Sequence, residues 1–269
     1  MERGHSIVST GQRKKSSKKG TQFILGDWMD ASRPDPAAEN LVLLQERNGS
    51  RGLIEAAFRE TVKDHLAGLS IIHRISGYKK SLAYIRNKMP RPIRVRSGDC
   101  GEILATEYIE QCTRYHVPIK RLRWKDDRDT TMRGDDVIAL RKAKTRWHVL
   151  KTESKSREVL TPAVILKAID GLDRNAGRPN PSSLAFISAR LRELNHDDEA
   201  DVFDELQAQT PRLGEIEHMV FTLSGNNPTA QLKLHMGNAS TLCRRHLIGC
   251  VIVDHQDFIN ALFDRICAG

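Results

Sequence analysis

The chain has 269 residues, of which 39% are hydrophobic and 29% are charged, as is usual for a globular protein of one large or two modest domains. No apolar run approaches the roughly eighteen residues of a membrane span and the N-terminus lacks an apolar signal-peptide core, so we expect neither a membrane protein nor a secreted one. Five cysteines without a CxxC pair indicate a reducing cytoplasm, and the formal net charge of +9 favours a polyanionic partner.

The first forty residues are rich in Ser, Lys, Gly, Pro and Asp, which predicts a disordered basic N-terminal tail and an extended lead-in. Only the short apolar segment Phe23-Ile24-Leu25 is expected to pack against the folded domain. The tail holds six basic residues against Glu2, a net charge of +5, and serves either as a solvated arm or as a nucleic-acid contact. The six are Arg3, Arg13, Lys14, Lys15, Lys18 and Lys19.

Residues 41–269 are expected to form one domain with a helical N-terminal part. Apolar residues recur at helical spacing over 52–69, and a shorter helix is predicted over 80–88, ended by Met89-Pro90. A third helix is expected to begin after Ser97-Gly98-Asp99, with Asp99 as its N-cap.

The pattern then changes to short apolar runs. Residues 136–140 and 147–150 flank a polar turn and predict a β-hairpin. Thr161-Pro162 supplies an N-cap and a first-turn proline for a helix. Strands are expected over 219–223 and 247–253, and a closing helix over 257–266. Together these elements predict an α/β fold with a mixed sheet flanked by helices.

Glu153-x-Lys155 ends the second strand of this hairpin, and side chains two apart on a strand share one face. Asp136 begins the first strand, so ladder pairing can bring its carboxylate beside Glu153. Two carboxylates and the Ser154 carbonyl suit Mg²⁺, which also keeps waters and bridges to phosphate oxygens. Lys155 can then neutralise charge that develops on a phosphate.

An acidic residue two positions before a lysine is common by chance, because strand surfaces often carry opposite charges. The sequence context favours a catalytic site over a chance pair of charges. Glu153 and Lys155 follow an apolar strand, and Asp136 opens another at hairpin distance. Unpaired carboxylates buried at this place are costly without a cation.

The spacing Gly134-x-Asp136 before one strand and Glu153-x-Lys155 at the end of the next resembles the signature of PD-(D/E)xK nucleases. Residues 96–108 resemble a helix of the nuclease subunit of Hachiman-type anti-phage systems (HamA-like). The resemblance covers residues 90–175, with weaker support from the C-terminal strand and helix. It implies a PD-(D/E)xK restriction-endonuclease-like sheet with Glu102 as the first acidic residue, Asp136 and Glu153 as metal ligands and Lys155 as the catalytic lysine.

The same resemblance implies a function: a deoxyribonuclease that uses Mg²⁺ or Mn²⁺, cleaves DNA in anti-phage defence, and is controlled by a superfamily 2 helicase subunit (HamB-like). Alternatives on the same fold are a restriction-type endonuclease or a junction resolvase. An alternative of another class is a non-catalytic nucleic-acid-binding regulatory subunit. The complete set Asp136, Glu153 and Lys155 argues against loss of activity.

Several of these residues have a second interpretation. Asp99 and Glu102 have capping-box spacing, so Glu102 either binds a helix-start amide or belongs to the site. Asp135 competes with Asp136 as the ligand. Ser156-Arg157 either contacts phosphate or forms a solvated loop.

Three further groups remain open. The spacing of one set of thiol and imidazole side chains is poor for zinc, and a cysteine inside a strand is usually a small buried hydrophobe. A basic patch at 121–125 either tracks nucleic acid or is a charged strand with Trp124 packed inward. The acidic stretch 193–205 cannot face DNA, and is a surface helix or a docking site. The zinc set is Cys243, His246, Cys250 and His255, and the apolar stripe of the acidic stretch is Val202, Phe203 and Leu206.

Overall fold

The structure is a computed structural model that describes residues 22–144, 146–208, 215–235 and 243–269. Six strands form a single mixed sheet in the order β1-β2-β6-β5-β4-β3. The central strands β4, β5 and β6 are parallel, as are β6 and β2, and β1 and β3 close the two edges in antiparallel pairing. The strands are β1 (Met29–Ser32), β2 (Leu41–Glu46), β3 (Val137–Ala143), β4 (Arg146–Arg157), β5 (Ile216–Ser224) and β6 (Arg244–Val251).

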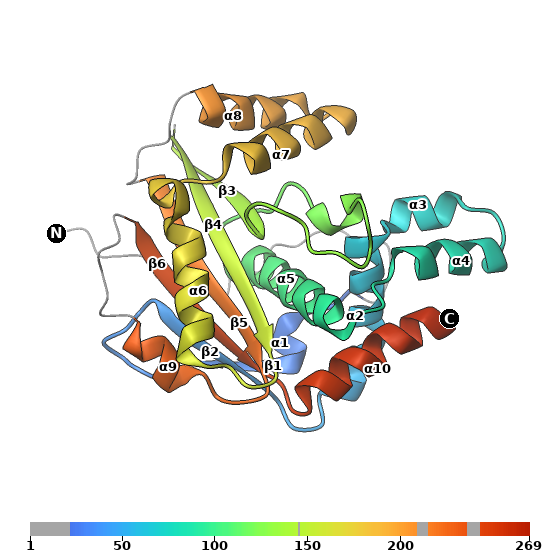
Figure 1. Cartoon of the computed structure of the whole chain (residues 1–269), viewed down its shortest axis with the longest axis horizontal. Coiled ribbons are helices and arrows are strands. Elements are labelled where there is room, and N and C mark those ends of the chain that lie inside the picture. Colours follow the sequence, from blue (N-terminus) through green and yellow to red (C-terminus); the bar gives the residue numbers. More distant parts are fainter. Residues whose placement is uncertain (1–21, 145, 209–214, 236–242) are drawn as a thin grey trace.

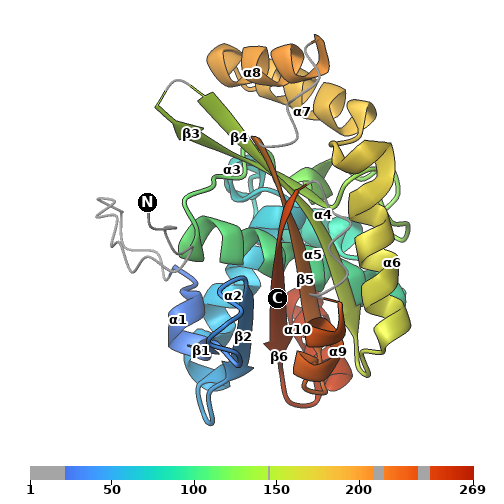
Figure 2. The same ribbon diagram turned by 90° about the vertical axis from the view of Figure 1, so that its left-hand side faces the viewer.

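Helices cover both faces of this sheet (Figures 1 and 2). On one face α5 packs on β4 and β5, with α2 and α10 behind it. On the other face α6 lies along β4 and β5, and α9 lies on β2 and β6. The helices are α1 (Leu25–Trp28), α2 (Arg51–Leu66), α3 (Leu69–Arg74), α4 (Tyr78–Lys88), α5 (Ile93–Cys112), α6 (Pro162–Asp173), α7 (Pro181–Glu193), α8 (Asp197–Ala208), α9 (Thr229–Leu234) and α10 (His255–Ala268), with short 3-10 turns at Arg121–Trp124 and Arg174–Gly177.

This arrangement confirms the predicted α/β class with a mixed sheet flanked by helices. Thr161 is the N-cap residue of α6 and Pro162 its first residue, as the sequence indicates. None of the helices in the described ranges is both long and apolar enough to span a bilayer.

The predicted lead-in contains regular structure that the sequence analysis missed. Phe23, Leu25 and Trp28 are buried in the main core beside Phe58 of α2, whereas Ile24 is exposed. Strands β1 and β2 follow directly. The basic tail, residues 1–20, lies outside the described residues.

The acidic stretch forms α8, which pairs with α7 at the far end of the β3–β4 hairpin (Figure 1). Its apolar stripe is not available to a partner, because Val202 and Phe203 are buried and Leu206 packs against the same cluster. Part of its negative charge is compensated within the chain, because Arg192 of α7 forms ion pairs with Asp197, Asp201 and Asp204. The structure therefore favours the surface helix over the docking site.

Candidate active site

The candidate site lies where β3 stops and β4 continues without it. The β3–β4 ladder ends at Val137 opposite Thr152, so residues 153–157 of β4 have no β3 partner. The Asp136 carboxylate takes the place of the missing strand: its Oδ2 accepts a hydrogen bond of 2.8 Å from the main-chain N–H of Ser154. The unequal lengths of the two strands thus bring Asp136 beside Glu153.

Lys155 joins the two carboxylates. Its Nζ lies 2.8 Å from Glu153 Oε2 and 3.9 Å from Asp136 Oδ2, and it donates to the Ser154 carbonyl at 3.2 Å. These three charged side chains are partly buried. Three of the four predicted site residues therefore form one cluster at the open edge of the sheet.

The alternation of β4 assigns its side chains to different helices. Glu153 faces α6, since a Cβ built on Gly171 would lie only 2.7 Å from Glu153 Cδ. Ser154 and Ser156 face α5, where a Cβ on Gly101 would lie 2.9 Å from Ser154 Oγ. Glycine at each contact allows a helix to approach the strand closely on either side.

The cluster holds more negative charge than Lys155 neutralises. Burial and the neighbouring Asp136 carboxylate raise the pKa of Glu153 to about 7, although Lys155 acts in the opposite direction. Two carboxylates beside one ammonium carry a formal charge of −1 when both are ionised. The protein alone therefore leaves this site short of positive charge.

Glu102 lies on α5, on the other side of Asp136. Burial raises its pKa to about 8; the charge of Arg121 lowers this value and that of Asp136 adds to it. The Arg121 guanidinium holds the carboxyl group, with Nε 3.4 Å from Glu102 Oε1, and also donates to the main-chain carbonyls of Asp135 and Arg133. No hydrogen bond or ion pair joins Glu102 to the Lys155 cluster among the described residues. Glu102 is a neighbour of the cluster rather than a member of it.

The capping interpretation of Asp99 and Glu102 is wrong. Helix α5 begins at Ile93, six residues before Asp99, and Gly98 lies within the helix instead of preceding it. Asp99 is buried and accepts hydrogen bonds of 2.7 and 2.8 Å from Lys125 Nζ. Burial raises the pKa of Asp99 to about 6 despite this partner. Glu102 is therefore free of any role at the helix start.

Asp135 and Asp136 have different surroundings. The Asp135 carboxylate accepts from the main-chain N–H of Asn180 at 2.6 Å and lies 3.5 Å from Lys151 Nζ. Lys151 is fully buried, and its ammonium lies within hydrogen-bond distance of four main-chain carbonyls at the end of α6 and around the turn that follows, which share its three N–H donors. Asp135 thus belongs to a structural network that ties the hairpin to α6 and α7, and Asp136 is the aspartate of the cluster.

Sequence reasoning missed Lys151, although a signal was present. Lysine inside an apolar strand, two residues before Glu153, must point to the same face as the site residues. A fully buried ammonium needs several acceptors, and the unpaired carbonyls at a helix C-terminus provide them. Lys151 fixes the end of α6, and Gly171 of that helix packs on Glu153.

The donor set of the cluster fits a hard divalent cation. Asp136 and Glu153 offer carboxylate oxygens beside the Ser154 carbonyl, and burial together with the Asp136 charge raises the pKa of Glu153, so a cation would favour its ionised form. No group of three or more His, Cys, Asp and Glu side chains in the described ranges is placed to hold a metal ion. An ion at this site would therefore rely on water and substrate oxygens for its remaining ligands.

The same finding argues against a zinc site formed by Cys243, His246, Cys250 and His255. His246 bonds to Glu217, and His255 bonds to the buried Ser156 hydroxyl at 2.9 Å. Cys250 is a buried strand residue, as the alternative interpretation held. Ser156 also bonds to Ser97 at 2.8 Å between α5 and β4, so it is a packing residue and not a phosphate contact.

The basic patch is a 3-10 turn and not a strand. Three of its cations are paired inside the protein: Arg121 with Glu102, Arg123 with Asp64 and Lys125 with Asp99. Trp124 packs edge-to-face with Phe186 of α7, with 6.3 Å between ring centroids. The patch therefore supports the walls of a pocket.

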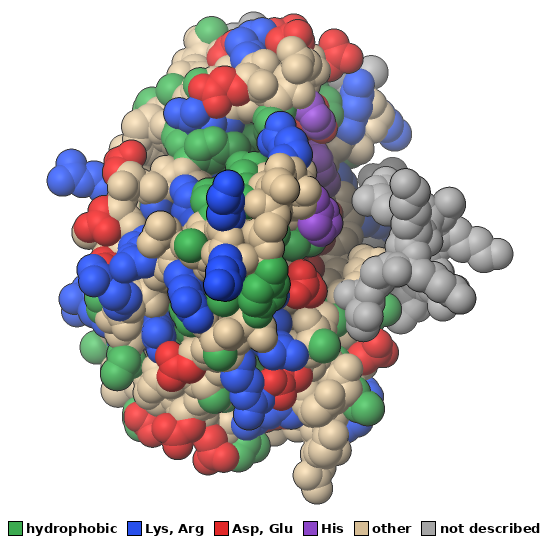
Figure 3. All heavy atoms as spheres, turned by 90° about the vertical axis from the view of Figure 1, so that its right-hand side faces the viewer, with side chains coloured by type: hydrophobic (Ala, Val, Ile, Leu, Met, Phe, Trp, Pro, Cys, Tyr) green, Lys and Arg blue, Asp and Glu red, His purple; other side chains and the backbone are tan. Residues whose placement is uncertain are grey.

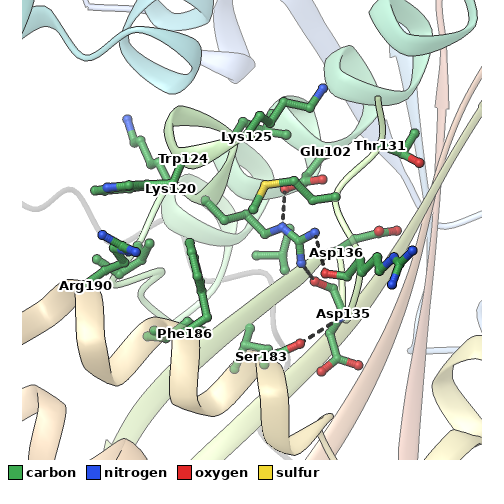
Figure 4. A pocket seen from close by; sticks show the side chains of 18 of the residues that line it. Glu102, Lys120, Trp124, Lys125, Thr131, Asp135, Asp136, Ser183, Phe186 and Arg190 are labelled. Carbon is green, nitrogen blue, oxygen red and sulfur yellow. Dashed lines mark hydrogen bonds and ion pairs between the residues drawn. The ribbon is translucent and has the colours of Figure 1, made fainter. Parts of the chain in front are cut away.

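That pocket has a volume of about 680 Å³ and opens beside Asp136. Figure 4 shows Glu102 and Asp136 at one end and Trp124, Phe186 and Arg190 at the other. Its walls come from α5, the 3-10 turn, the loop before β3 and the first turns of α7. A space of this size lies within the range of small-molecule sites.

Comparison with known proteins gives two matches. The family model of HamA matches residues 46–266, most of the chain. The Hachiman protein HamA of Bacillus cereus is 28% identical over 153 residues, which are 56% of this chain and 53% of that protein. The chain thus spans about half the length of the curated relative that it matches. On the strength of the family match, the chain belongs to the HamA family.

Proposed function

We propose that this protein is a metal-dependent DNA nuclease of the PD-(D/E)xK type that acts in anti-phage defence. The observation that carries the proposal is the cluster of Asp136, Glu153 and Lys155 at the open edge of β4. One hydrogen bond from the Ser154 N–H accounts for a single oxygen of Asp136, and Lys155 is the one cation paired with either carboxylate among the described residues, whereas the Asp135–Lys151 pair is tied into main-chain hydrogen bonds on all sides. The order and spacing of the three residues resemble the PD-(D/E)xK signature.

Asp136 and Glu153 would hold the cation, Mg²⁺ or Mn²⁺. When bound, such an ion lowers the pKa of a coordinated water and polarises a phosphate oxygen. The chain's own residues orient this chemistry. The Ser154 N–H fixes one oxygen of Asp136, and Gly171 allows Glu153 to sit against α6. Lys155 places a positive charge where a phosphate would gain negative charge.

Glu102 has a supporting role in this proposal. Its carboxyl group shares the Asp136 side of the site and carries a pKa raised to about 8, so it is largely protonated at neutral pH. A carboxyl group in this state can donate a hydrogen bond to a substrate oxygen or to a water molecule. Arg121 keeps it in place without joining it to Lys155.

The surface supports a polyanionic substrate. Residues 75–98 contain seven basic residues and no acidic one. Lys79, Lys80 and Arg94 are exposed and form no ion pair with any described carboxylate. Figure 3 shows blue side chains spread over the face of the molecule that carries α3 and α4. Exposed basic side chains of this kind bind phosphates irrespective of the base sequence.

The proposals of a defence role and of a helicase partner are based on the family to which the chain belongs. Membership of the HamA family and the name of the Bacillus cereus relative, a Hachiman protein, support a part in anti-phage defence. We further propose that a superfamily 2 helicase subunit controls cleavage, because an unrestrained cytoplasmic nuclease would attack the host genome. A partner can do so only if it favours one state of the site over another.

The test is cleavage of supercoiled plasmid by the purified chain, with Mg²⁺ or with chelator, and with and without the candidate helicase subunit. Glu153→Gln and Lys155→Met should each lower the rate on the order of 100-fold, because they remove a ligand and a charge stabiliser. Glu60→Gln and Lys63→Met are the matched controls, since these residues form a solvent-accessible ion pair on α2.

Melting temperatures of all four variants establish that they remain folded. Wild-type rates in folded Glu153→Gln protein would remove Glu153 from the site. Cleavage that persists in chelator, or that is absent under every condition, would contradict the nuclease proposal as a whole.

A further inference from the structure

The pocket beside the candidate site has two ends of different chemistry. The carboxyl groups of Glu102 and Asp136 line one end, and the rings of Trp124 and Phe186 line the other (Figure 4). Both rings are partly buried and belong to different elements, the 3-10 turn and α7. A nuclease that only needed to reach a phosphate would require an open strand edge but no aromatic recess beside it.

The basic residues that line the pocket differ in whether a carboxylate of the protein already pairs with them. Lys120, Arg121 and Lys125 are paired with Asp64, Glu102 and Asp99, so they have little charge to offer to a ligand. Arg133 lines the same pocket, is exposed, and pairs with no described carboxylate. The loop before β3 therefore contributes one available cation to the lining of the pocket.

We propose that this pocket holds one unpaired nucleobase of the strand whose phosphodiester lies at Asp136 and Glu153, with Arg133 on an adjacent phosphate. The inference rests on the proposed nuclease function and names its substrate class: single-stranded nucleic acid, or a base extruded from a duplex. Aromatic side chains bind unpaired bases of any sequence, because every base has a π-face. A cavity of about 680 Å³ has room for one nucleotide.

The bases of an intact duplex cannot enter this pocket. A paired base is stacked on both sides, and reaches a recess only after unstacking and unpairing. The two rings that line the pocket lie on the 3-10 turn and on α7, beside the end of the strand that carries the candidate site. We therefore expect the protein to prefer strands that are already unpaired.

The experiment measures binding by tryptophan fluorescence in chelator, so that no cleavage is needed. The chain has three tryptophans: Trp28 is buried in the core, Trp147 lies near the hairpin turn, and Trp124 lines the pocket. The probes are a twelve-residue oligothymidylate, an abasic strand with the same number of phosphates, and a blunt duplex of the same length. The oligothymidylate should quench the fluorescence, and the other two should not.

Variants assign the signal to the pocket. Trp124→Phe should lose most of the quench, whereas Trp147→Phe should keep it. Phe186→Ala should weaken binding of a labelled oligothymidylate about tenfold, the lower range expected for loss of one stacking partner. Leu206→Ala is its control, because Leu206 packs in the same α7–α8 cluster but does not line the pocket.

The outcomes separate the two proposals. A quench that persists in Trp124→Phe, or equal binding of the abasic strand, overturns the base pocket even if plasmid cleavage is normal. Equal weakening by Leu206→Ala would do the same, since it would reduce the effect to loosened packing. A normal quench in a protein that never cleaves plasmid would instead contradict the nuclease proposal and leave the pocket as a nucleic-acid site.

Discussion

Four acidic residues at or beside the candidate site are held by three different cations. Lys155 bridges Glu153 and Asp136, Arg121 holds Glu102, and Lys125 holds Asp99. Burial nevertheless raises the pKa of Glu153, Glu102 and Asp99. The folded protein therefore maintains these carboxyl groups in surroundings that favour the protonated form, and a bound cation would relieve that cost at Glu153.

The pH dependence of stability should expose this cost at Glu102. Its pKa is raised from an ordinary 4.5 to about 8, so the folded state binds more protons than the unfolded state between these values, and stability falls as pH rises through them. Glu102→Gln is neutral in both states and removes this dependence. In chelator, the free energy of unfolding of Glu102→Gln minus that of wild type should increase from pH 5 to 8, by at most about 1.4 kcal/mol per pH unit. Above pH 8 this difference should level off.

Glu107 on the same helix is a control of opposite sign. Burial raises its pKa, but the His65 hydrogen bond, the Lys120 charge and, where the ring is protonated, the His65 charge outweigh burial and lower the pKa below 4.5. Because burial lowers the pKa of His65 itself, Lys120 and the hydrogen bonds from His65 and Gln111 hold the ionised carboxylate at neutral pH. Its ionised form therefore stabilises the fold above pH 4.5, and Glu107→Gln should be less stable than wild type throughout pH 5 to 8. Denaturant melts at several pH values measure both differences. A flat difference for Glu102→Gln would mean that its carboxyl group has an ordinary pKa.

At the scale of elements, the site depends on how closely α6 approaches β4. A Cβ at position 171 would lie 2.7 Å from Glu153 Cδ and 3.0 Å from both carboxylate oxygens, so even alanine must displace this side chain. Alanine normally stabilises a helix by about 1 kcal/mol relative to glycine. This substitution should therefore impair function with little net change in stability.

Gly171→Ala should lower plasmid cleavage at least tenfold and change the melting temperature little, because the gain in helix propensity offsets the clash. Gly98→Ala in α5 is the matched control: a Cβ there meets nothing within 4 Å, so it should stabilise the protein by about 0.5–1 kcal/mol and leave cleavage unchanged. Normal cleavage by Gly171→Ala would show that the position of Glu153 against α6 is not important.

The same elements explain what the sequence could and could not predict. Local patterns identified the hairpin and α6, and pairing within the hairpin brought Asp136 to Glu153. The start of α5 was wrong, because Ser97-Gly98-Asp99 has the composition of a helix N-terminus but lies inside the helix, where Asp99 binds Lys125. Contacts between distant segments have no local pattern. Arg121 on Glu102 and α7 on the aromatic turn could only come from the fold.

At the scale of the whole molecule, charge is distributed unevenly. The predicted tail carries +5 of the formal +9, and residues 75–98 carry +7 within a body whose other segments are acidic on balance. Arg86, Arg91 and Arg96 of the basic segment are partly engaged by Cys267, Asp129 and Asp264, whereas Lys79, Lys80 and Arg94 are exposed without such partners. Two separate regions can therefore contribute to phosphate binding.

Salt dependence can separate these two regions. Each phosphate neutralised by a lysine or arginine contributes about 0.9 to the slope of log affinity against log salt on duplex DNA and about 0.7 on single strands. If all six basic residues of the tail touch phosphate, deletion of residues 1–20 should flatten the slope on a single strand by about 4. If only the body binds, the slope should not change, and Lys79→Gln with Lys80→Gln should flatten it by about 1.

The deletion must stop at Gly20, because Phe23 and Leu25 are buried in the main core and a longer deletion would destabilise the fold. A full-length variant with the six basic residues replaced by glutamine controls for the loss of chain length. Titrations of labelled oligonucleotide at several salt concentrations give the slopes. Deletion and charge removal should agree if the tail acts through charge. An unchanged slope in both would assign phosphate binding to the α4 face and leave the tail as a solvated arm.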